Sequence, residues 1–377
     1  MEQDGARLRV GLVGAGLIGQ AVHAHYLWDE RARFELAAVA DPSAAARDAV
    51  GDRYAIAERH PSLDGLLGLG LDAIVVATPD ALHADVTCRA LEAGLHVLCE
   101  KPLALSLAEC DRIIAARDAS GRVVQVGTMK RYDPAYLRLL ELLPESAADV
   151  RYLSIEVRDP GHGPFVAHLP VTLAHDLPPG LGDELRSRVA ERVREVAGEE
   201  PPPGAARAFT AYLSSLVHDV SLLQGVLEHL GEPWCERADD GAWWDDGRAV
   251  SLSAALPGGG RAHLVHHHAP GVNDYSQRLT LHCTDRVLEL TFPSPYLLHQ
   301  PTRLVEIRSD GAVGRRSTDR LVSYEEAFRE ELRAFSDACA GRARLATPAE
   351  AGRADIALLL DAYGHALARG SATYAAR

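Results

Sequence analysis

The sequence predicts an α/β protein with two domains, a doubly wound parallel sheet followed by an α+β domain with a large, open, mainly antiparallel sheet. Three observations support this fold class. The chain has 377 residues, which is too long for one ordinary core. Up to residue 127, short apolar runs alternate with helical patterns, as in strands joined by crossover helices. After Tyr132 the apolar runs follow one another through short, turn-rich connections, which favours antiparallel pairing.

The first 127 residues show this alternation clearly. Apolar runs predict strands at Leu8–Val13, Phe34–Ala40, Asp72–Ala77, His96–Glu100 and Val123–Gly127. Helical patterns follow the first strand through about Trp28 and run again from about Leu82 to Ala93. Another helix begins at Ser106, whose spacing to Glu109 is that of a capping box.

The second part of the chain has a different pattern. Leu153, Ile155 and Val157 alternate with polar residues, so we expect a strand with one exposed face. Further strands are predicted at Val250–Leu256, Ala262–His268, Arg278–Cys283, Val287–Phe292 and Leu304–Arg308. Capping patterns at Ser323–Glu326 and Thr347–Glu350 indicate two late helices.

These elements divide the chain into residues 1–127, residues 128–346 and a final helical segment, 347–377, that we expect to pack back on both domains. Residues 160–207 interrupt the second domain as an insertion with one helix. The apolar stripe of this helix fits a surface helix covering a sheet edge, a lid over the site or an oligomer contact. Trp243-Trp244 stands in an Asp- and Gly-rich stretch, which we interpret as an exposed loop.

Composition excludes several classes of protein. The formal net charge is −14, which argues against nucleic-acid binding because that function needs a basic face. No apolar run approaches the ~20 residues of a membrane helix, and the first residues lack a signal-peptide pattern. We therefore expect a cytoplasmic protein. The six cysteines form no C-x-x-C pair, so free thiols are expected rather than disulfides or structural zinc.

A glycine-rich turn follows the first predicted strand and opens a helix, and in that context the G-x-G-x-x-G pattern is typical of a dinucleotide site. The residues concerned are Gly14, Gly16, Leu17, Ile18 and Gly19. The first glycine permits the turn, the second admits a pyrophosphate, and the third allows close helix packing. Asp41, at the end of the next strand, is placed to accept hydrogen bonds from a ribose. Its charge would repel a 2′-phosphate, so NAD is favoured over NADP.

Lysine is rare in this chain. There are 37 arginines but only two lysines, Lys101 and Lys130. Such bias suggests that lysine is kept where a compact ammonium that can lose its proton is needed.

Four segments resemble the glucose–fructose oxidoreductase / inositol dehydrogenase superfamily of nicotinamide-dependent dehydrogenases. They are the glycine turn Gly14–Gly19, the T-P-D-A-L-H element within Ala77–His83, the A-G-L-H-V-L-C-E-K-P block Ala93–Pro102, and the G-T-M-K-R-Y-D-P stretch Gly127–Pro134. The third is the most specific. The resemblance implies a Rossmann domain followed by an open sheet whose exposed face meets substrate and sometimes another subunit, and hence a homo-oligomer, dimer or tetramer.

The resemblance also implies roles for individual residues. Thr78, Pro79 and His83 would line the cofactor together with Glu100. Lys101 would direct its ammonium at the substrate hydroxyl and the nicotinamide ribose. Lysine suits this role because its pKa falls readily when it is buried.

The catalytic helix of the family carries D-x-x-x-H, with the histidine as general base. In this chain His218 matches the histidine, but Ser214 stands where the aspartate is expected. Ser214 could still hydrogen-bond His218 or substrate because positions i and i+4 share a helix face. The missing carboxylate makes His218 a weaker base. Asp219 is expected to point elsewhere on the helix.

A group of histidines follows within one predicted strand. His266 and His268 share one face and His267 takes the other. Two ligands on one strand are too few for zinc, so no metal site is predicted. We expect His266 and His268 to make polar contacts to a sugar on the exposed face of the sheet.

Together these features predict an NAD-dependent dehydrogenase acting on a sugar, glycoside, nucleotide sugar or cyclitol. His218 takes the hydroxyl proton, Lys101 polarises the developing carbonyl, and Arg131 and Tyr132 shape the substrate pocket. Two alternatives remain open. One is an NAD-dependent oxidation–elimination enzyme resembling certain glycosidases, and the other is a non-catalytic NAD-binding regulator.

Overall fold

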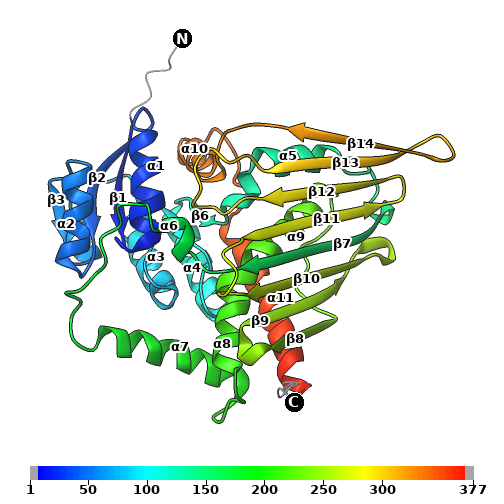
Figure 1. The fold of residues 1–377 in the computed structure, drawn as a ribbon. Coiled ribbons are helices and arrows are strands. Elements are labelled where there is room, and N and C mark those ends of the chain that lie inside the picture. Colours follow the sequence, from blue (N-terminus) through cyan, green and yellow to red (C-terminus); the bar gives the residue numbers. More distant parts are fainter. Residues whose placement is uncertain (1–6, 370–377) are drawn as a thin grey trace. The chain divides into compact units, whose positions relative to one another are not determined.

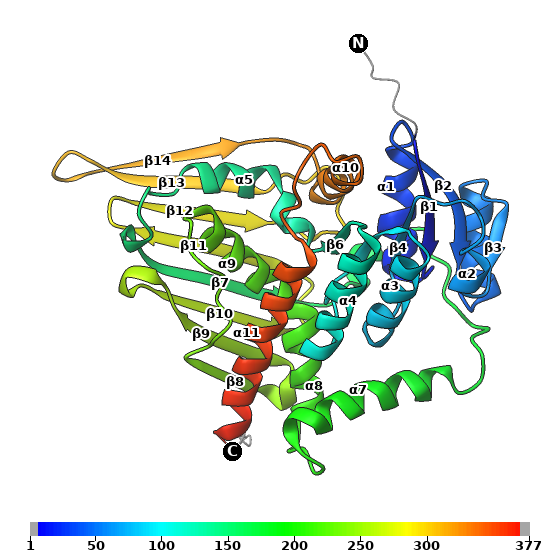
Figure 2. The same cartoon turned by 180° about the vertical axis from the view of Figure 1, so that it is seen from behind.

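The computed structural model describes residues 7–369. Within this range the chain forms two compact units. Unit 1 comprises residues 7–128, 168–189 and 328–353, and unit 2 comprises residues 129–167, 190–327 and 354–369. Figures 1 and 2 show the elements of both units, which are described separately below.

Unit 1 contains a sheet of six parallel strands in the order β3-β2-β1-β4-β5-β6. The strands are β1 (Leu8–Val13), β2 (Phe34–Ala40), β3 (Glu58–His60), β4 (Ala73–Val76), β5 (His96–Glu100) and β6 (Val124–Gly127). The helices are α1 (Ala24–Asp29), α2 (Ala44–Arg53), α3 (His83–Glu92), α4 (Leu107–Ser120) and α10 (Ala327–Cys339), whose first residue belongs to unit 2. The predicted doubly wound parallel sheet is confirmed.

The register of this sheet brings several loops to one edge. Val13 pairs with Ala40 of β2 and with Val76 of β4, and Val76 in turn pairs with Cys99 of β5. The carboxyl ends of these four strands are therefore level with one another. The strand order reverses between β1 and β4, and ligands of open α/β sheets bind at such switch points.

Unit 2 contains a sheet of eight strands in the order β14-β13-β12-β11-β7-β10-β9-β8. The strands are β7 (Val150–Asp159), β8 (Asp240–Trp244), β9 (Ala249–Ala255), β10 (Arg261–His268), β11 (Ser276–Cys283), β12 (Arg286–Phe292), β13 (Arg303–Asp310) and β14 (Gly314–Leu321). Neighbours pair antiparallel except β7 and β10, which are parallel. The predicted mainly antiparallel second sheet is confirmed.

Helices cover one face of the second sheet. They include α5 (Pro134–Glu141), α9 (Val217–His229) and the part of α11 (Ala349–Ala368) that lies in unit 2, all in front of the sheet in Figure 2. On β7, Leu153, Ile155 and Val157 are buried against this layer, whereas Tyr152 and Glu156 are exposed. The expected one-sided burial of this strand is therefore present. The remaining helices are α6 (Gly163–Val166), α8 (Ala205–Thr210) and α7 (Leu181–Ala197), the last with residues in both units.

Three strands were not predicted, namely β3, β8 and β14. The interpretation of Trp243-Trp244 as an exposed loop is wrong, because both residues belong to β8. Trp243 is buried and stacks on Tyr363 of α11 with 5.7 Å between the ring centroids. Trp243 on the edge strand β8 thus belongs to the core, although polar residues surround this segment in the sequence.

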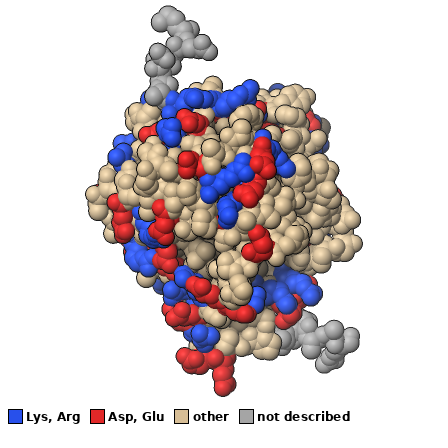
Figure 3. All heavy atoms as spheres, turned by 90° about the vertical axis from the view of Figure 1, so that its left-hand side faces the viewer, with Lys and Arg blue, Asp and Glu red and all other residues tan. Residues whose placement is uncertain are grey.

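The surface carries charges of both signs. On the face drawn in Figure 3, Lys and Arg side chains are interspersed with Asp and Glu side chains. Over residues 7–369, no helix combines the length and the apolar character needed to cross a lipid bilayer.

Candidate functional site

The glycine turn between β1 and the following helix has one open position and two closed ones. Gly14 has φ of 103°, and a Cβ added there would lie 2.3 Å from the Ala77 carbonyl oxygen. A Cβ on Gly19 would lie 2.0 Å from the Gly14 carbonyl oxygen. A Cβ on Gly16 would meet nothing within 4 Å. The first and third glycines are therefore required by packing, and the second leaves the backbone accessible to a ligand.

Asp41 follows β2 and joins it to this turn. Its Oδ2 accepts a hydrogen bond from the Ala15 N–H at 2.7 Å, and its Oδ1 accepts one from the Ser43 N–H at 2.8 Å. Ionised carboxylate oxygens have further lone pairs, so Asp41 can still accept from a ribose hydroxyl. Asp41 is half-buried, and its bond to Ala15 attaches it to the residue that precedes Gly16.

His83 lies beneath the loop after β4. Its Nδ1 is 2.7 Å from the Pro102 carbonyl oxygen and its Nε2 is 2.9 Å from the Thr78 carbonyl oxygen. Burial lowers the pKa of His83, whereas the Cys99 side chain, Asp80 and the Pro102 carbonyl raise it, and the result is a pKa of about 10. Because both partners are carbonyl oxygens, this arrangement favours a ring that is protonated on both nitrogens. His83 is only 1% exposed, and its two hydrogen bonds join the segments that contain Thr78 and Pro102.

Lys101 follows β5 directly and is half-buried. Its backbone N–H donates to Glu100 Oε2 at 3.1 Å, and the Lys101–Pro102 peptide bond is cis. Glu100 Oε1 lies 2.9 Å from His23 Nε2. Burial raises the pKa of Glu100, but His23 and Lys101 lower it, and the net shift is downward. An ionised Glu100 therefore lies beneath the backbone that presents Lys101.

In unit 2, His218 and Ser214 lie on the accessible side of one helical run. Residues Ala211–Leu216 form a π-helical stretch that continues into α9. Ser214 and His218 are both half-buried, whereas Leu216, Val217 and Asp219 are buried. Local π-helical turns often occur at functional sites. The structure thus places the expected base and the serine one turn before it on the same side of the helix.

A buried polar cluster includes Asp219, the residue after His218 on α9, and the sequence did not predict it. Asp219 is 1% exposed, and its Oδ1 accepts a hydrogen bond from Gln277 Nε2 at 2.6 Å. Lys130 Nζ donates to Gln277 Oε1 and lies 3.3 Å from the Tyr275 hydroxyl, which itself donates to Gln277 Oε1 at 2.8 Å. We call Lys130, Asp219, Tyr275, Gln277 and His266 the polar cluster.

Two atoms of the polar cluster have no hydrogen-bond partner among the described residues, Asp219 Oδ2 and His266 Nδ1. Burial raises the pKa of Asp219 to about 6, against the lowering effects of Lys130, His266 and Gln277. Burial, with Asp219 and Asp159 nearby, raises the pKa of Tyr275 well above its usual value. A buried polar atom without a partner is costly, so such atoms commonly face a water molecule or a ligand.

The expectation for the histidines of β10 is partly wrong. His266 is only 5% exposed and lies on the helix-covered side of the sheet, not on the exposed face. Its Nε2 is 3.7 Å from Asp159 Oδ2. His268 is half-buried, and His267 lies 3.9 Å from Asp245 on the other side. The period of the strand was predicted correctly, but its polarity did not reveal which face the helices would cover.

Arg131 also has a different role from the one expected. Its guanidinium is buried, donates to the Ser221 carbonyl oxygen at 3.1 Å and binds Glu228 at 2.6 Å. Both partners lie on α9. Arg131 therefore fixes the helix that carries His218 instead of facing a substrate. Tyr132 is likewise buried, at 6% exposure.

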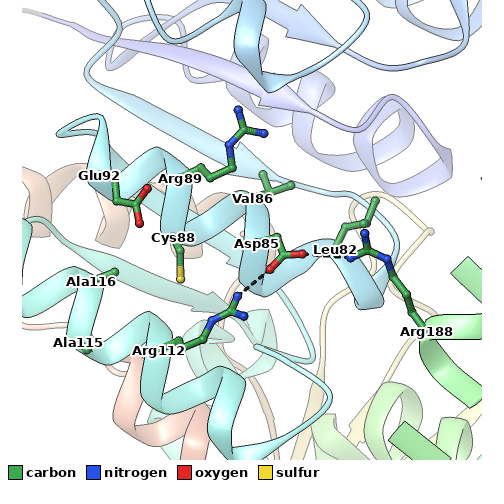
Figure 4. A pocket seen from close by; sticks show the side chains of 10 residues that line it. All are labelled: Leu82, Asp85, Val86, Cys88, Arg89, Glu92, Arg112, Ala115, Ala116 and Arg188. Atoms are coloured by element: carbon green, nitrogen blue, oxygen red, sulfur yellow. Dashed lines mark hydrogen bonds and ion pairs between the residues drawn. The ribbon is translucent and has the colours of Figure 1, made fainter. Parts of the chain in front are cut away.

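A surface hollow of about 730 Å³ lies between α3 and α4 (Figure 4). Asp85 at its centre binds Arg112 at 2.6 Å and Arg188 at 3.0 Å. Asp85 thus pairs with two of the three arginines that line the hollow, and the third, Arg89, binds Asp64 outside it. None of the residues predicted for the site lines it.

The sequence singled out Lys130 through the rarity of lysine and its place in the Gly127–Pro134 stretch but gave it no role, and it gave none to Asp219. Tyr275 and Gln277 belong to no motif. The one usable signal for these residues was a charged residue, Asp219, at a position of α9 where its apolar neighbours Val220 and Leu222 indicate a core-facing side.

Comparison with known proteins supports the family. Residues 8–128 match a family model described as an oxidoreductase family with an NAD-binding Rossmann fold. An inositol 2-dehydrogenase from Salmonella paratyphi B is 37% identical over 139 residues, which are 36% of this chain and 41% of that protein. An inositol 2-dehydrogenase from Acidothermus cellulolyticus is 33% identical over 223 residues, which are 59% of this chain and 54% of that protein. The chain therefore aligns with only 41% to 54% of the length of these relatives.

Solved structures extend the likeness over both units. UDP-N-acetylglucosamine 3-dehydrogenase from Acidithiobacillus ferrooxidans has a TM-score of 0.69 and 21% identity, covering 96% of this chain and 99% of that one. A 3-ketoreductase from Actinomadura kijaniata, solved with NADP and TDP-benzene, has a TM-score of 0.69 and 19% identity, covering 95% and 97%. At these identities the likeness shows the fold. Residues 8–128 therefore match an oxidoreductase family with an NAD-binding Rossmann fold, and the inositol 2-dehydrogenases are similar over part of their length.

Proposed function

We propose that this protein is an NAD-dependent oxidoreductase that moves hydride between the cofactor and a ring hydroxyl or ketone of a polyhydroxylated substrate. The observation that carries the proposal is the open backbone at Gly16 beside the Asp41 carboxylate. Sugars, glycosides, nucleotide sugars and cyclitols are the candidate substrates.

The residues of unit 1 fit a dinucleotide. The pyrophosphate would lie against the backbone of Gly16, Leu17 and Ile18 at the start of the helix, where unpaired N–H groups and the helix dipole favour an anion. Asp41 would accept from the adenosine ribose, and its charge favours NAD over NADP. When bound, NAD supplies the acceptor for a hydride.

Two residues of the chain would handle the substrate hydroxyl. His218 accepts the hydroxyl proton on an imidazole nitrogen, since a neutral imidazole is a competent base near neutral pH. The Lys101 Nζ would donate a hydrogen bond to a substrate oxygen as negative charge develops on it. Glu100 and His83 position the backbone that carries Lys101 and so act through it.

The polar cluster of unit 2 would bind the other ring hydroxyls. Asp219 Oδ2 and His266 Nδ1 are buried and have no hydrogen-bond partner in the described structure, and alternating donors and acceptors suit a polyol. Lys130 and Tyr275 supply donors beside them. The inositol 2-dehydrogenases among the relatives favour a cyclitol or a sugar of similar size.

The test is to incubate the protein with NAD and a panel of cyclitols, free sugars and nucleotide sugars, and to follow NADH formation. Net NADH with one substrate class supports the dehydrogenase. Substrate consumption without net NADH supports the oxidation–elimination alternative instead. Binding of NAD without turnover of any member would leave the regulatory alternative in place and overturn the proposal.

A further inference from the structure

A segment of the insertion, residues 168–176, belongs to unit 1, although residues 129–167 separate it in the sequence from the first part of that unit. We call this segment the strap. Figure 1 shows it in green beside β1 and α2, before the chain enters α7. Three groups of contacts attach it to elements that surround the proposed cofactor site.

The first contact is at the helix after the glycine turn. Gln20 Nε2 donates to the Thr172 carbonyl oxygen at 2.8 Å, and the Thr172 N–H donates back to Gln20 Oε1 at 2.9 Å. The same Gln20 Nε2 also donates to the Ala15 carbonyl oxygen at 2.7 Å. Gln20 is only 2% exposed. One buried amide therefore joins the strap to the glycine turn.

The second and third contacts are at α2. Arg53, the last residue of this helix, donates to the Pro170 carbonyl oxygen. At the other end, Asp176 accepts a hydrogen bond from the Ser43 hydroxyl on one carboxylate oxygen and from the Ala45 N–H at 3.1 Å on the other. Ser43 is completely buried. These bonds lower the pKa of Asp176, so its charge is stable at neutral pH.

Asp176 binds the N-terminus of α2, next to the residues that follow Asp41. Ser43 is bound by two carboxylates, because its N–H donates to Asp41 and its hydroxyl donates to Asp176. The N-terminus of α2 is the position where a helix would offer N–H groups to a phosphate next to the ribose. In this chain those groups are already taken by Asp41, Asp176 and the Ser43 hydroxyl, which binds the Ala46 N–H at 3.1 Å.

We propose that Asp176 of the strap is a second residue that determines cofactor specificity, because it occupies with a carboxylate the anion position that the 2′-phosphate of NADP would need. This inference rests on the proposed function, since it assumes that unit 1 binds a dinucleotide at the glycine turn. NAD, with only hydroxyls at that ribose, leaves Asp176 in place. NADP would have to displace Asp176 and the strap, or accept repulsion from two carboxylates.

The experiment measures the dissociation constants of NAD and NADP by calorimetry for the wild type and three variants. Asp176→Asn removes the charge and keeps an acceptor oxygen. Asp176→Ala removes both and frees the Ser43 hydroxyl and the Ala45 N–H for a phosphate. Asp183→Asn is the matched control. Asp183 lies in the same insertion, but its carboxylate binds Arg186 and not the residues at the start of α2.

We expect the ratio of the NADP constant to the NAD constant to fall about tenfold in Asp176→Ala and less in Asp176→Asn, with the affinity for NAD changed less than about threefold. Asp183→Asn should keep the wild-type ratio. The preference of the wild type should also shrink as salt is added, because salt screens exposed charges.

An unchanged ratio in both Asp176 variants, alongside tight NAD binding, would overturn the role of Asp176 and leave the proposed function intact. A wild-type protein that binds neither dinucleotide would overturn both. Asp176 is exposed, so thermal melting is expected to show all variants folded, and a shared loss of folding would itself contradict a role confined to specificity.

Discussion

The cofactor region of unit 1 and the polar cluster of unit 2 are built in opposite ways. The first is made mainly by backbone: a left-handed glycine, an open glycine and N–H groups that a single carboxylate orders. The second is made by side chains drawn from the start of unit 2, from α9 and from β10 and β11. A backbone site depends on a few neighbouring residues, whereas a side-chain site depends on how distant elements pack.

The two regions also differ in how their buried carboxylates are bound and in the direction in which the pKa of each is shifted. In the cofactor region of unit 1, the Glu100 carboxylate is bound to His23 and its pKa is lowered. The polar cluster keeps Asp219 with a raised pKa and with one oxygen that has no partner in the described chain. The first region suits a ligand that is the same in every reaction cycle, the dinucleotide. The second retains polar groups whose hydrogen bonds a substrate or water would complete.

The largest expected effect comes from removing the proposed acid–base groups. Lys101→Ala should lower turnover by roughly a hundredfold or more and leave NAD affinity largely intact, because a positioned donor acts mainly in the transition state. Steady-state kinetics and calorimetry on the same preparation measure both quantities. Lys130→Met is the companion variant in the other region and should act mainly on KM. If Lys101→Ala and Lys130→Met lower turnover equally, the proposed difference between a region that acts on turnover and one that acts on KM is wrong.

A second prediction separates the glycines of the turn. Gly14→Ala should destabilise the protein by about 2–3 kcal/mol, because the residue has a positive φ and its Cβ would overlap the Ala77 carbonyl. Gly16→Ala should leave the free energy of unfolding nearly unchanged and weaken NAD binding, since its Cβ points into open space. Urea denaturation and NAD titration measure the two effects. A Gly16→Ala protein that binds NAD normally would show that the cofactor does not approach this backbone.

A third prediction concerns pH and Asp219. Its pKa of about 6 in the folded state lies above the usual value of 3.8, so the folded protein binds this proton more tightly than the unfolded chain does. The resulting stability is fully present below about pH 4 and is lost as the pH rises through 6, an effect of about 2–3 kcal/mol. Asp219→Asn imitates the protonated form and should remove this loss. Urea unfolding at several pH values, with Asp310→Asn as an exposed control, measures it.

The smallest expected effect is a shift in a pH profile. Ser214→Asp adds a carboxylate one turn before His218, and a nearby negative charge stabilises a protonated imidazole. The acidic limb of the oxidation profile should move upward by about one pH unit or more, because His218 must be neutral to accept a proton. Ser214→Ala should move it little. An unmoved limb in Ser214→Asp, together with an active His218→Ala protein, would assign proton transfer to another residue.

Much of unit 1 was predictable because its signals are local. The predicted strands Leu8–Val13, Phe34–Ala40 and His96–Glu100 have the observed boundaries, since buried parallel strands are continuous apolar runs. The capping box at Ser106 was also correct in part: its hydroxyl accepts from the Glu109 N–H, while Glu109 reaches the Leu105 N–H.

Unit 2 was less predictable because its signals are not local. β14 was missed because its residues are nearly all polar, and it is held by pairing with β13 and by ion pairs such as Arg320 to Glu306. Asp219 was set aside because it points away from His218 on the helix. That reasoning was correct about direction, but only the fold reveals that Gln277 and Lys130 meet it there.

The division of the chain into units has a consequence for how the protein is made. Unit 1 takes its third segment, 328–353, from late in the chain, and there Thr347 and Pro348 pair with the outer strand β6 through Val126 and Gln125. During synthesis, β6 emerges about two hundred residues before the segment that covers it, so the sheet carries a bare edge while unit 2 is being translated. A fragment that ends after β6 retains that edge permanently. We therefore expect a separately expressed dinucleotide domain that ends after β6 to associate with other copies through this strand.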